Sequence, residues 1–147
     1  MRVILDANII VSYLLSPDHE GCISEIVTAA LLGRYSLLVP PGLADEVGGA
    51  VNRARYLAGR ITAQQAADLM DVLAQAAISI PAIARQIPAI VRDSKDDYLI
   101  AYAVMGQADY LVTGDKDLLV IRQVGDLRIV STHEFQAILR GAAAAQK

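Results

Sequence analysis

The sequence has very little cysteine, histidine or tryptophan, and each shortage excludes a class of structure. Its 147 residues include one cysteine, Cys22, and no tryptophan. A single cysteine excludes a disulfide framework and is typical of a protein from a reducing cytoplasm. The two histidines, His19 and His133, are too few and too far apart for a structural zinc site.

Long hydrophobic runs are also missing, although 54% of the residues are hydrophobic and the mean hydropathy is +0.40. The longest apolar run, from Tyr98 to Met105, has about eight residues, whereas a bilayer-spanning helix needs roughly 18. The N-terminus, with one arginine before an expected strand, does not resemble a signal peptide. We therefore expect a cytoplasmic protein outside the membrane. Its high apolar content favours a homo-oligomer face or a partner groove.

An excess of positive charge is absent as well, because the formal net charge is −3. No global basic field draws this chain to nucleic acid, which counts mildly against such a substrate but leaves room for a local basic rim. The only dense basic segment contains Arg53, Arg55 and Arg60. These arginines, with Lys116, are candidate contacts for RNA phosphates or an acidic partner, and the alternative for them is a solvated face.

Apolar stretches and helical periodicity alternate along the chain, which predicts one α/β domain. Val3 to Leu5 is apolar on both faces, as in a central strand of a parallel sheet. Further strands are expected at residues 36–39, 78–80, 110–113 and 127–130. Amphipathic helices between them predict a three-layer α/β/α sandwich around a mostly parallel sheet of about five strands. We expect the domain to cover residues 1–140, with Gly141 ending the last helix and residues 141–147 frayed.

Details of several helices follow from their caps and breakers. Asn8 can start the first helix, Ser94 opens a helix before the fourth strand, and Ser131 with Glu134 forms a capping box. Thr62 forms another capping box, and residues 82–92 are expected to be loop. Gly48-Gly49 weakens the third helix by roughly 1 kcal/mol per glycine relative to alanine, so that helix is expected to be short or closely packed.

Four acidic residues lie near the carboxyl ends of the expected strands or at the start of a helix beside them. Asp6 and Asp115 each follow the carboxyl end of an expected strand, Glu46 follows the second strand, and Asp97 opens the helix before the fourth. If the strand order reverses beside strand one, strands one and four are neighbours at the switch point, where α/β sheets bind ligands. Asp6 and Asp115 would then face one crevice, with the other two acids on its walls.

Clustered carboxylates repel one another and are costly to desolvate without a cation among them. Lys116 is the one nearby lysine, so a divalent metal ion is the natural neutraliser. Oxygen ligands without histidine or cysteine favour Mg²⁺ or Mn²⁺ over zinc. Such an ion supports phosphodiester hydrolysis, because it activates water and stabilises the developing charge.

These residues together resemble the PIN-domain family of metal-dependent ribonucleases, many of which are toxins of bacterial toxin–antitoxin pairs (VapC-like proteins). The resemblance runs from Arg2 to about Leu139. Each motif alone is weak, but the four occur in the family's order and spacing: Leu5-Asp6-Ala7-Asn8, Glu46, Asp97-Tyr98-Leu99-Ile100-Ala101 and Thr113-Gly114-Asp115-Lys116-Asp117-Leu118.

The resemblance implies roles for these residues and partners for the chain. It implies an RNA substrate, a Mg²⁺ or Mn²⁺ cofactor, a homodimer and a cognate antitoxin that covers the acidic cleft. The family usually has Thr or Ser after the first Asp, whereas this chain has Ala7 and so lacks that hydroxyl. Asn8 and Thr113 would orient the carboxylates. The implied metal-binding acids are Asp6, Glu46, Asp97 and Asp115, with Asp117 in support.

Plainer interpretations of the same acids stay open. Asp6 can cap the following helix, Asp97 can complete a capping box with Ser94, and Glu46 can be a surface residue. Asp115 and Asp117 can belong to an ordinary turn after a strand.

Three other function classes also compete with the nuclease. One is a catalytically silent PIN-like scaffold for protein contacts, which should show a broken acid set. A phosphatase of the haloacid-dehalogenase type needs a second Asp at position 8, where this chain has Asn8. A receiver domain needs an acidic pair directly after the first strand, and only Asp6 is there.

Overall fold

The computed structural model describes residues 1–15, 21–58, 63–79 and 94–145. The described residues form, in chain order, β1 (Arg2–Leu5), α1 (Ala7–Leu15), α2 (Cys22–Leu31), β2 (Ser36–Val39), α3 (Leu43–Ala58), α4 (Ala63–Ala76), β3 (Ile78–Ser79), α5 (Ser94–Met105), β4 (Tyr110–Val112), α6 (Lys116–Leu119), β5 (Gln123–Val124), β6 (Leu127–Val130) and α7 (Thr132–Ala145).

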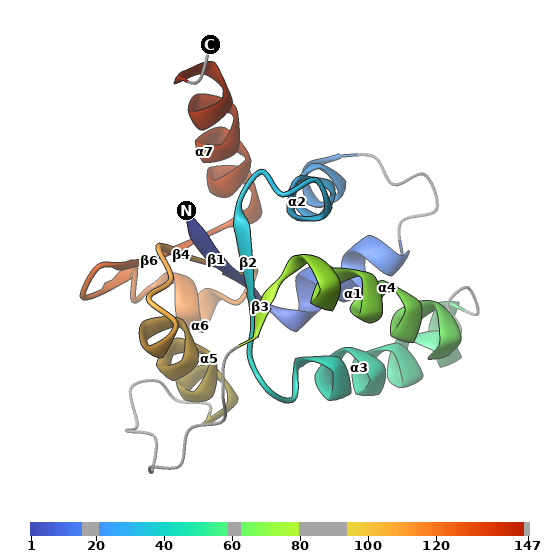
Figure 1. Ribbon diagram of the computed structural model, residues 1–147. Helices are drawn as coiled ribbons and strands as arrows, with labels where there is room; N and C mark the ends of the chain where they lie inside the picture. The colour runs from blue at the N-terminus through green and yellow to red at the C-terminus, as the bar shows by residue number, and fades with distance from the viewer. Residues whose placement is uncertain (16–20, 59–62, 80–93, 146–147) are drawn as a thin grey trace.

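The strands form one sheet in the order β3-β2-β1-β4-β6-β5 (Figure 1). Strands β3, β2, β1, β4 and β6 are parallel to their neighbours, and β5 pairs with β6 in the antiparallel direction. The predicted mostly parallel sheet is therefore confirmed, with β5 as one short edge strand more than expected. Because the chain runs outwards from β1 in both directions, the strand order reverses between β1 and β4. This meets the condition under which strands one and four are neighbours at the switch point.

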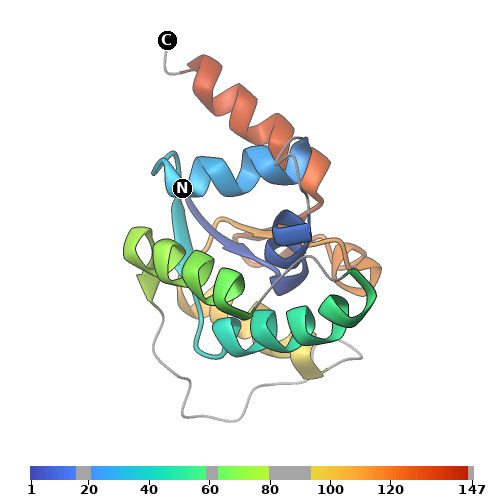
Figure 2. The same cartoon turned by 90° about the vertical axis from the view of Figure 1, so that its right-hand side faces the viewer.

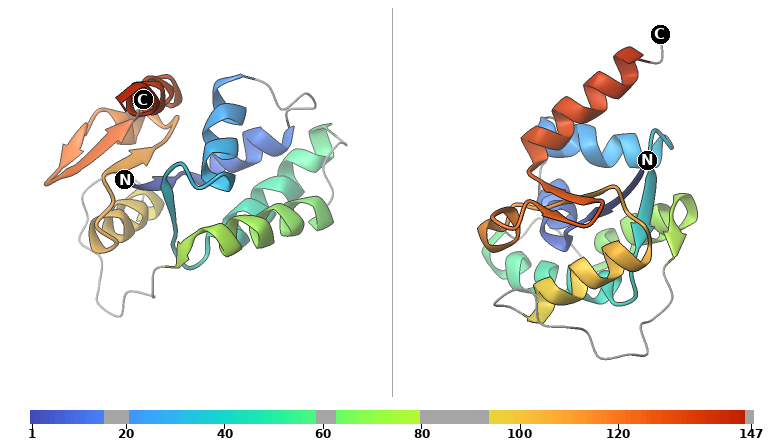
Figure 3. Two further views of the ribbon diagram at one scale, coloured as in Figure 1. Left: turned by 45° about the horizontal axis from the view of Figure 1, so that its top comes forward. Right: turned by 90° about the vertical axis from the view of Figure 1, so that its left-hand side faces the viewer.

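Helices cover both faces of the sheet, and the strands alternate their side chains between two cores. Val3 and Leu5 pack into the core under α1, α2, α3, α4 and α7, whereas Ile4 packs into the core under α5 and α6. All three side chains have no exposed surface. Figures 2 and 3 show these layers from other sides, with α2 and α7 on one face and α5 on the opposite one. The fold is the predicted three-layer α/β sandwich.

Most predicted elements lie where the sequence placed them, and three details are corrected. Strands β2 and β6 have the predicted bounds, and α5 begins at Ser94 as expected. The first helix begins at Ala7 rather than Asn8. Helix α6 and strand β5 were not predicted, because elements of four and two residues are too short to show periodicity. Thr62 and the predicted loop at residues 82–92 lie outside the described residues.

The last helix does not end at Gly141, as the sequence had predicted, but continues to Ala145. Gly141 is not among the described residues with a positive φ, so it does not adopt the left-handed conformation of a C-terminal glycine cap. The alanines that follow have the highest helix propensity, which favours continuation. The predicted domain boundary at residue 140 stays a prediction, although no break in α7 coincides with it.

Helix α3 runs through Gly48 and Gly49 for 16 residues and is not short. A Cβ atom added at Gly48 would meet no atom within 4 Å, so close packing does not explain this glycine either. Gly48→Ala is therefore expected to raise the free energy of unfolding by roughly 0.5–1 kcal/mol, measured by chemical denaturation. Gly33→Ala is the matched contrast. Because Gly33 has φ +73°, alanine at this position should lower the free energy of unfolding. A loss of stability in Gly48→Ala would contradict the interpretation.

Candidate active site

Asp6 lies at the carboxyl end of β1, directly beside β4. Its backbone N–H donates to the carbonyl oxygen of Val112 at 3.0 Å, which continues the pairing of the two strands by one residue. Its carboxylate Oδ1 accepts a hydrogen bond from the N–H of Asn8 at 3.2 Å. Asp6 thus caps α1, and the positive end of that helix favours the charged carboxylate. Capping and ion binding are compatible, because each carboxylate oxygen can accept a hydrogen bond and still offer a second lone pair.

Thr113 joins the two acids that the sequence placed at this edge of the sheet. Its side chain is fully buried. Its hydroxyl donates to Oδ2 of Asp6 at 2.7 Å and accepts a hydrogen bond from the N–H of Asp115 at 3.0 Å. One hydroxyl therefore fixes the orientation of the first carboxylate and the start of the loop that carries the second. Asp6 and the backbone of Asp115 are thus linked at the neighbouring ends of β1 and β4. The role of the two acids in a common site stays a prediction.

Asp115 is the N-cap residue of α6. Its Oδ1 accepts a hydrogen bond from the N–H of Asp117 at 2.9 Å, so the plain interpretation as a turn-forming acid is also correct. Within the described part of the chain, no hydrogen bond reaches Oδ2 of Asp115. The side chain of Asp117 is exposed, and only its backbone takes part in this arrangement.

Glu46 lies in the first turns of α3, and its charge acts on the hydroxyl of Tyr98 on α5. The pKa of the Tyr98 hydroxyl is raised by burial, by Tyr102 and by the negative charge of Glu46. A Cβ atom placed on Gly42, just before α3, would lie 3.3 Å from the Tyr98 hydroxyl oxygen. The Tyr98 hydroxyl, which the sequence analysis did not single out, therefore leaves little room for a side chain at Gly42. Its position next to Asp97 was the only available signal.

The donor set fits a hard divalent cation in its chemistry, since it consists of carboxylate oxygens. Two of these carboxylates, on Asp6 and Asp115, are held by neighbouring strand ends. Among the described side chains, no three acids, histidines or cysteines are grouped closely enough to hold a metal ion. The four-acid cluster is thus present only in part: Glu46 does not join the pair, and the side chain of Asp97 lies outside the described residues.

The two residues that follow Asp6 are Ala7, which replaces the family's usual Thr or Ser, and Asn8, which was expected to orient the carboxylates. Ala7 is 6% exposed and packs in the core under α1. The Asp6 carboxylate instead accepts a hydrogen bond from the hydroxyl of Thr113. Asn8 contacts Asp6 through its backbone N–H, and its own side chain is exposed.

The predicted basic contacts are mostly outside the described part of the structure. Arg53 and Arg55 lie on α3, but their side chains are not described, and Arg60 lies in the gap before α4. Lys116 is exposed in the first turn of α6, next to Asp115. No helix in the described ranges has the length and apolar character that a bilayer crossing requires.

Comparison with known proteins identifies the family of the chain. The sequence model of the PIN domain family matches residues 2–117, which include β1, α3, β4 and the acids at their ends. No curated protein and no solved structure matches the chain at a significant level. PIN domains are generally nucleases that use divalent metal ions. From its acid pair at the switch point, its sheet order and this match over most of its length, the chain belongs to the PIN domain family.

Proposed function

We propose that this chain is a metal-dependent endoribonuclease and the toxin of a toxin–antitoxin pair, acting in the cytoplasm with Mg²⁺ or Mn²⁺. The observation that supports the nuclease most directly is the hydrogen-bonded series Asp6–Thr113–Asp115 across β1 and β4. This series holds the Asp6 carboxylate and the backbone of Asp115 at the carboxyl ends of neighbouring strands, where open α/β folds bind their ligands. Membership of a nuclease family supports the same conclusion.

In this proposal the protein binds and orients, and no side chain acts as a nucleophile. Asp6 and Asp115 hold the ion. Glu46, Asp97 and Asp117 remain proposed further ligands, although Glu46 and Asp117 are not grouped with the pair in the described structure. When bound, the ion supplies an activated water and neutralises charge on the phosphate. Thr113 holds the Asp6 carboxylate in one orientation through its hydroxyl, and the cap on α1 limits the carboxylate's rotation.

The toxin role rests on the resemblance to toxin ribonucleases and not on a contact within this chain. In that role a small antitoxin would cover the acid pair, and two copies of the chain would form a dimer. Val104 and Met105 at the end of α5 are about half exposed and are apolar surface that a second copy would cover. A neighbouring gene for a small antitoxin would separate a toxin from a housekeeping nuclease.

Metal removal tests the proposed chemistry on the wild-type chain. We expect purified protein to cleave single-stranded RNA with Mg²⁺ or Mn²⁺, to lose this activity in a chelator, and to regain it when either ion is restored. The reason is that the paired carboxylates repel both each other and the substrate until a cation lies between them. The measurement is the appearance of internal cleavage products on a denaturing gel.

Three results would contradict a metal-dependent nuclease. Absence of cleavage with either ion, in a folded sample, would favour the silent scaffold. Cleavage that persists in the chelator would favour a reaction that does not use the acid pair. Release of phosphate from small phosphate esters without RNA cleavage would instead favour a phosphatase.

A further inference from the structure

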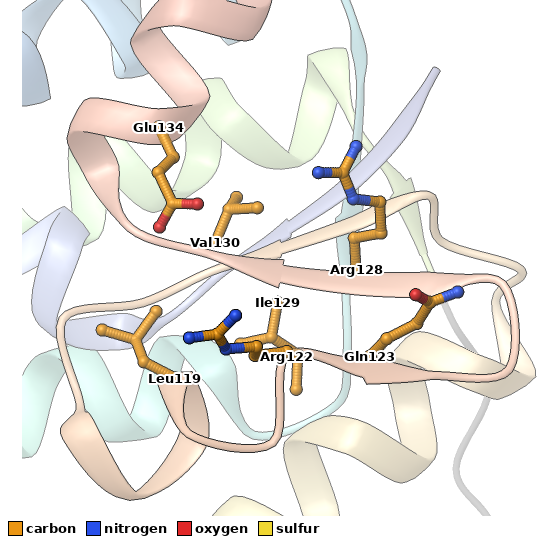
Figure 4. A pocket seen from close by; sticks show the side chains of 7 residues that line it. All are labelled: Leu119, Arg122, Gln123, Arg128, Ile129, Val130 and Glu134. Carbon is orange, nitrogen blue, oxygen red and sulfur yellow. The ribbon is translucent and has the colours of Figure 1, made fainter.

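A polar pocket lies beside the acid pair, on the part of the sheet formed by β6 and β5. It has a volume of about 460 Å³, and Figure 4 shows the side chains around it. Arg122 enters from the loop between α6 and β5, Arg128 extends from β6, and Glu134 approaches from α7. The remaining lining residues are Leu119, Gln123, Ile129 and Val130. None of these residues was a candidate in the sequence, where the two arginines stand singly.

Charge in the pocket is positive on balance. Arg122 and Arg128 are both exposed, and among the described side chains neither has an acidic partner within ion-pair distance. Arg128 instead lies over the ring of Tyr110, with its guanidinium carbon 5.7 Å from the ring centroid. The one acid, Glu134, accepts a hydrogen bond from the N–H of Ser131 at 3.2 Å, in the capping box of α7. The pocket is therefore lined by two arginines that have no acidic partner among the described side chains.

The backbone conformation of Arg122 determines where its side chain reaches the pocket. Arg122 has φ +66°, a conformation that residues other than glycine rarely adopt. Its carbonyl oxygen accepts a hydrogen bond from the N–H of Ile129 at 2.8 Å, which holds it beside the carboxyl-terminal half of β6. Arg122 is thus closer than Arg128 to the sheet edge that carries the acids, since β6 runs parallel to β4 and ends at that edge.

Backbone hydrogen bonds connect the residues around the acid pair to residues that line the pocket. The N–H of Thr113 donates to the carbonyl oxygen of Val130 at 3.0 Å, and the N–H of Leu119 donates to that of Asp115 at 3.0 Å. Val130 and Leu119 both line the pocket. Strand β5 is two strands away from β4, or roughly 10 Å across the sheet. One single-stranded substrate can therefore reach from the acids to both arginines.

From this geometry we infer that the pocket binds the phosphodiester backbone of RNA next to the bond that is cleaved, with Arg122 and Arg128 as the phosphate contacts. The inference rests on the proposed function, which it extends by naming the substrate's path from the acid pair over β6. Arginine suits this role because its planar guanidinium donates to two phosphate oxygens at once. A basic groove without base-specific contacts binds single strands of many sequences.

Binding and cleavage are measured separately, so that the two proposals can fail independently. A fluorescein-labelled oligouridylate is titrated with protein in a chelator at several KCl concentrations, and fluorescence anisotropy gives the affinity. Arg122→Gln and Arg128→Gln should each weaken binding by roughly three- to tenfold, as expected for loss of a charge-assisted contact. Each should also reduce the dependence of log K on log[KCl] by about 0.7, the value for one phosphate of a single strand. Arg128→Lys should retain most of the affinity.

Glu134→Gln is the variant that should change RNA affinity in the opposite direction. Glutamine can keep the capping box with Ser131 while removing the only negative charge of the pocket, so RNA affinity should rise by roughly two- to fivefold. Arg34→Gln is the matched control, because Arg34 is exposed near the amino end of β2, at the opposite edge of the sheet. It should bind RNA like the wild type. Thermal unfolding of every variant checks that each is folded.

The results separate three cases. Weaker binding in folded arginine variants, with unchanged Arg34→Gln, supports the pocket as the RNA site. If the wild type cleaves RNA but the arginine variants bind it as tightly as Arg34→Gln does, the inference is overturned and the nuclease stands. If these variants keep RNA affinity but lose affinity for a polyglutamate peptide, the pocket binds an acidic protein and the inference is overturned.

Discussion

Asp6→Asn should abolish most RNA cleavage, lowering the rate with Mg²⁺ or Mn²⁺ by roughly 100-fold or more. Loss of one carboxylate charge removes several kcal/mol of the interaction that holds the ion in place for the reaction, and about 1.4 kcal/mol corresponds to a factor of ten in rate. Asparagine keeps an oxygen that can accept the hydrogen bond from Thr113 or from the N–H of Asn8, so the fold should persist. Cleavage rates under single-turnover conditions give the change.

Asp71→Asn is the control for this substitution. Asp71 is exposed on α4, in the layer of helices away from the acid pair, and its loss changes the net charge by the same amount. It should cleave RNA at the wild-type rate. Equal cleavage by wild type and Asp6→Asn would show that the nuclease assignment is wrong. Titration calorimetry with Mn²⁺ should also show weaker ion binding by Asp6→Asn than by Asp71→Asn, independently of any RNA.

Thr113→Val should lower both activity and stability. The fully buried hydroxyl serves Oδ2 of Asp6 and the N–H of Asp115, so valine leaves two polar groups without this partner. The expected loss of unfolding free energy is about 1–3 kcal/mol. Residues that orient metal ligands usually change metal affinity or activity by roughly 10–100-fold, and we expect the same range here. Chemical denaturation and the RNA cleavage assay measure the two effects.

Thr113→Ser distinguishes the effect of the hydroxyl from the effect of the buried methyl group. Serine keeps both hydrogen bonds and loses one buried methyl group, which costs about 1 kcal/mol. Its cleavage rate should stay within a few-fold of the wild type although its stability falls. Thr28→Val, at an exposed position on α2, should change neither quantity. If serine and valine reduced cleavage equally at similar stability, Thr113 would have only a packing role.

Much of the fold could be predicted because its main signals are local. The apolar run from Val3 to Leu5 identified the central strand, and the capping box of Ser131 and Glu134 identified the start of α7. Errors arose where a single residue was given too much weight. Gly48 and Gly141 lower helix propensity, but packing of the neighbouring residues and the following alanines keep α3 and α7 helical through them.

The candidate site could be predicted only in outline. Asp6 and Asp115 were identified because acids at strand ends stand out in an apolar sequence, and the structure brings them together. The proximity of Tyr98 to Gly42 could not be predicted from the sequence, because the two residues are far apart in the chain. The pocket arginines were also overlooked. Arg122 and Arg128 line one pocket because β5 folds back on β6.

By itself, the sequence determined the alternation of strands and helices, the central position of β1 and the acids at the strand ends, since these follow from residue types and their local spacing. Only the tertiary structure decided which strand ends are neighbours. The hydroxyl of Thr113 reaches Asp6 across 107 positions of the chain, because β4 pairs directly with β1. Such pairing depends on how all the apolar faces are buried together, and no local segment encodes that choice.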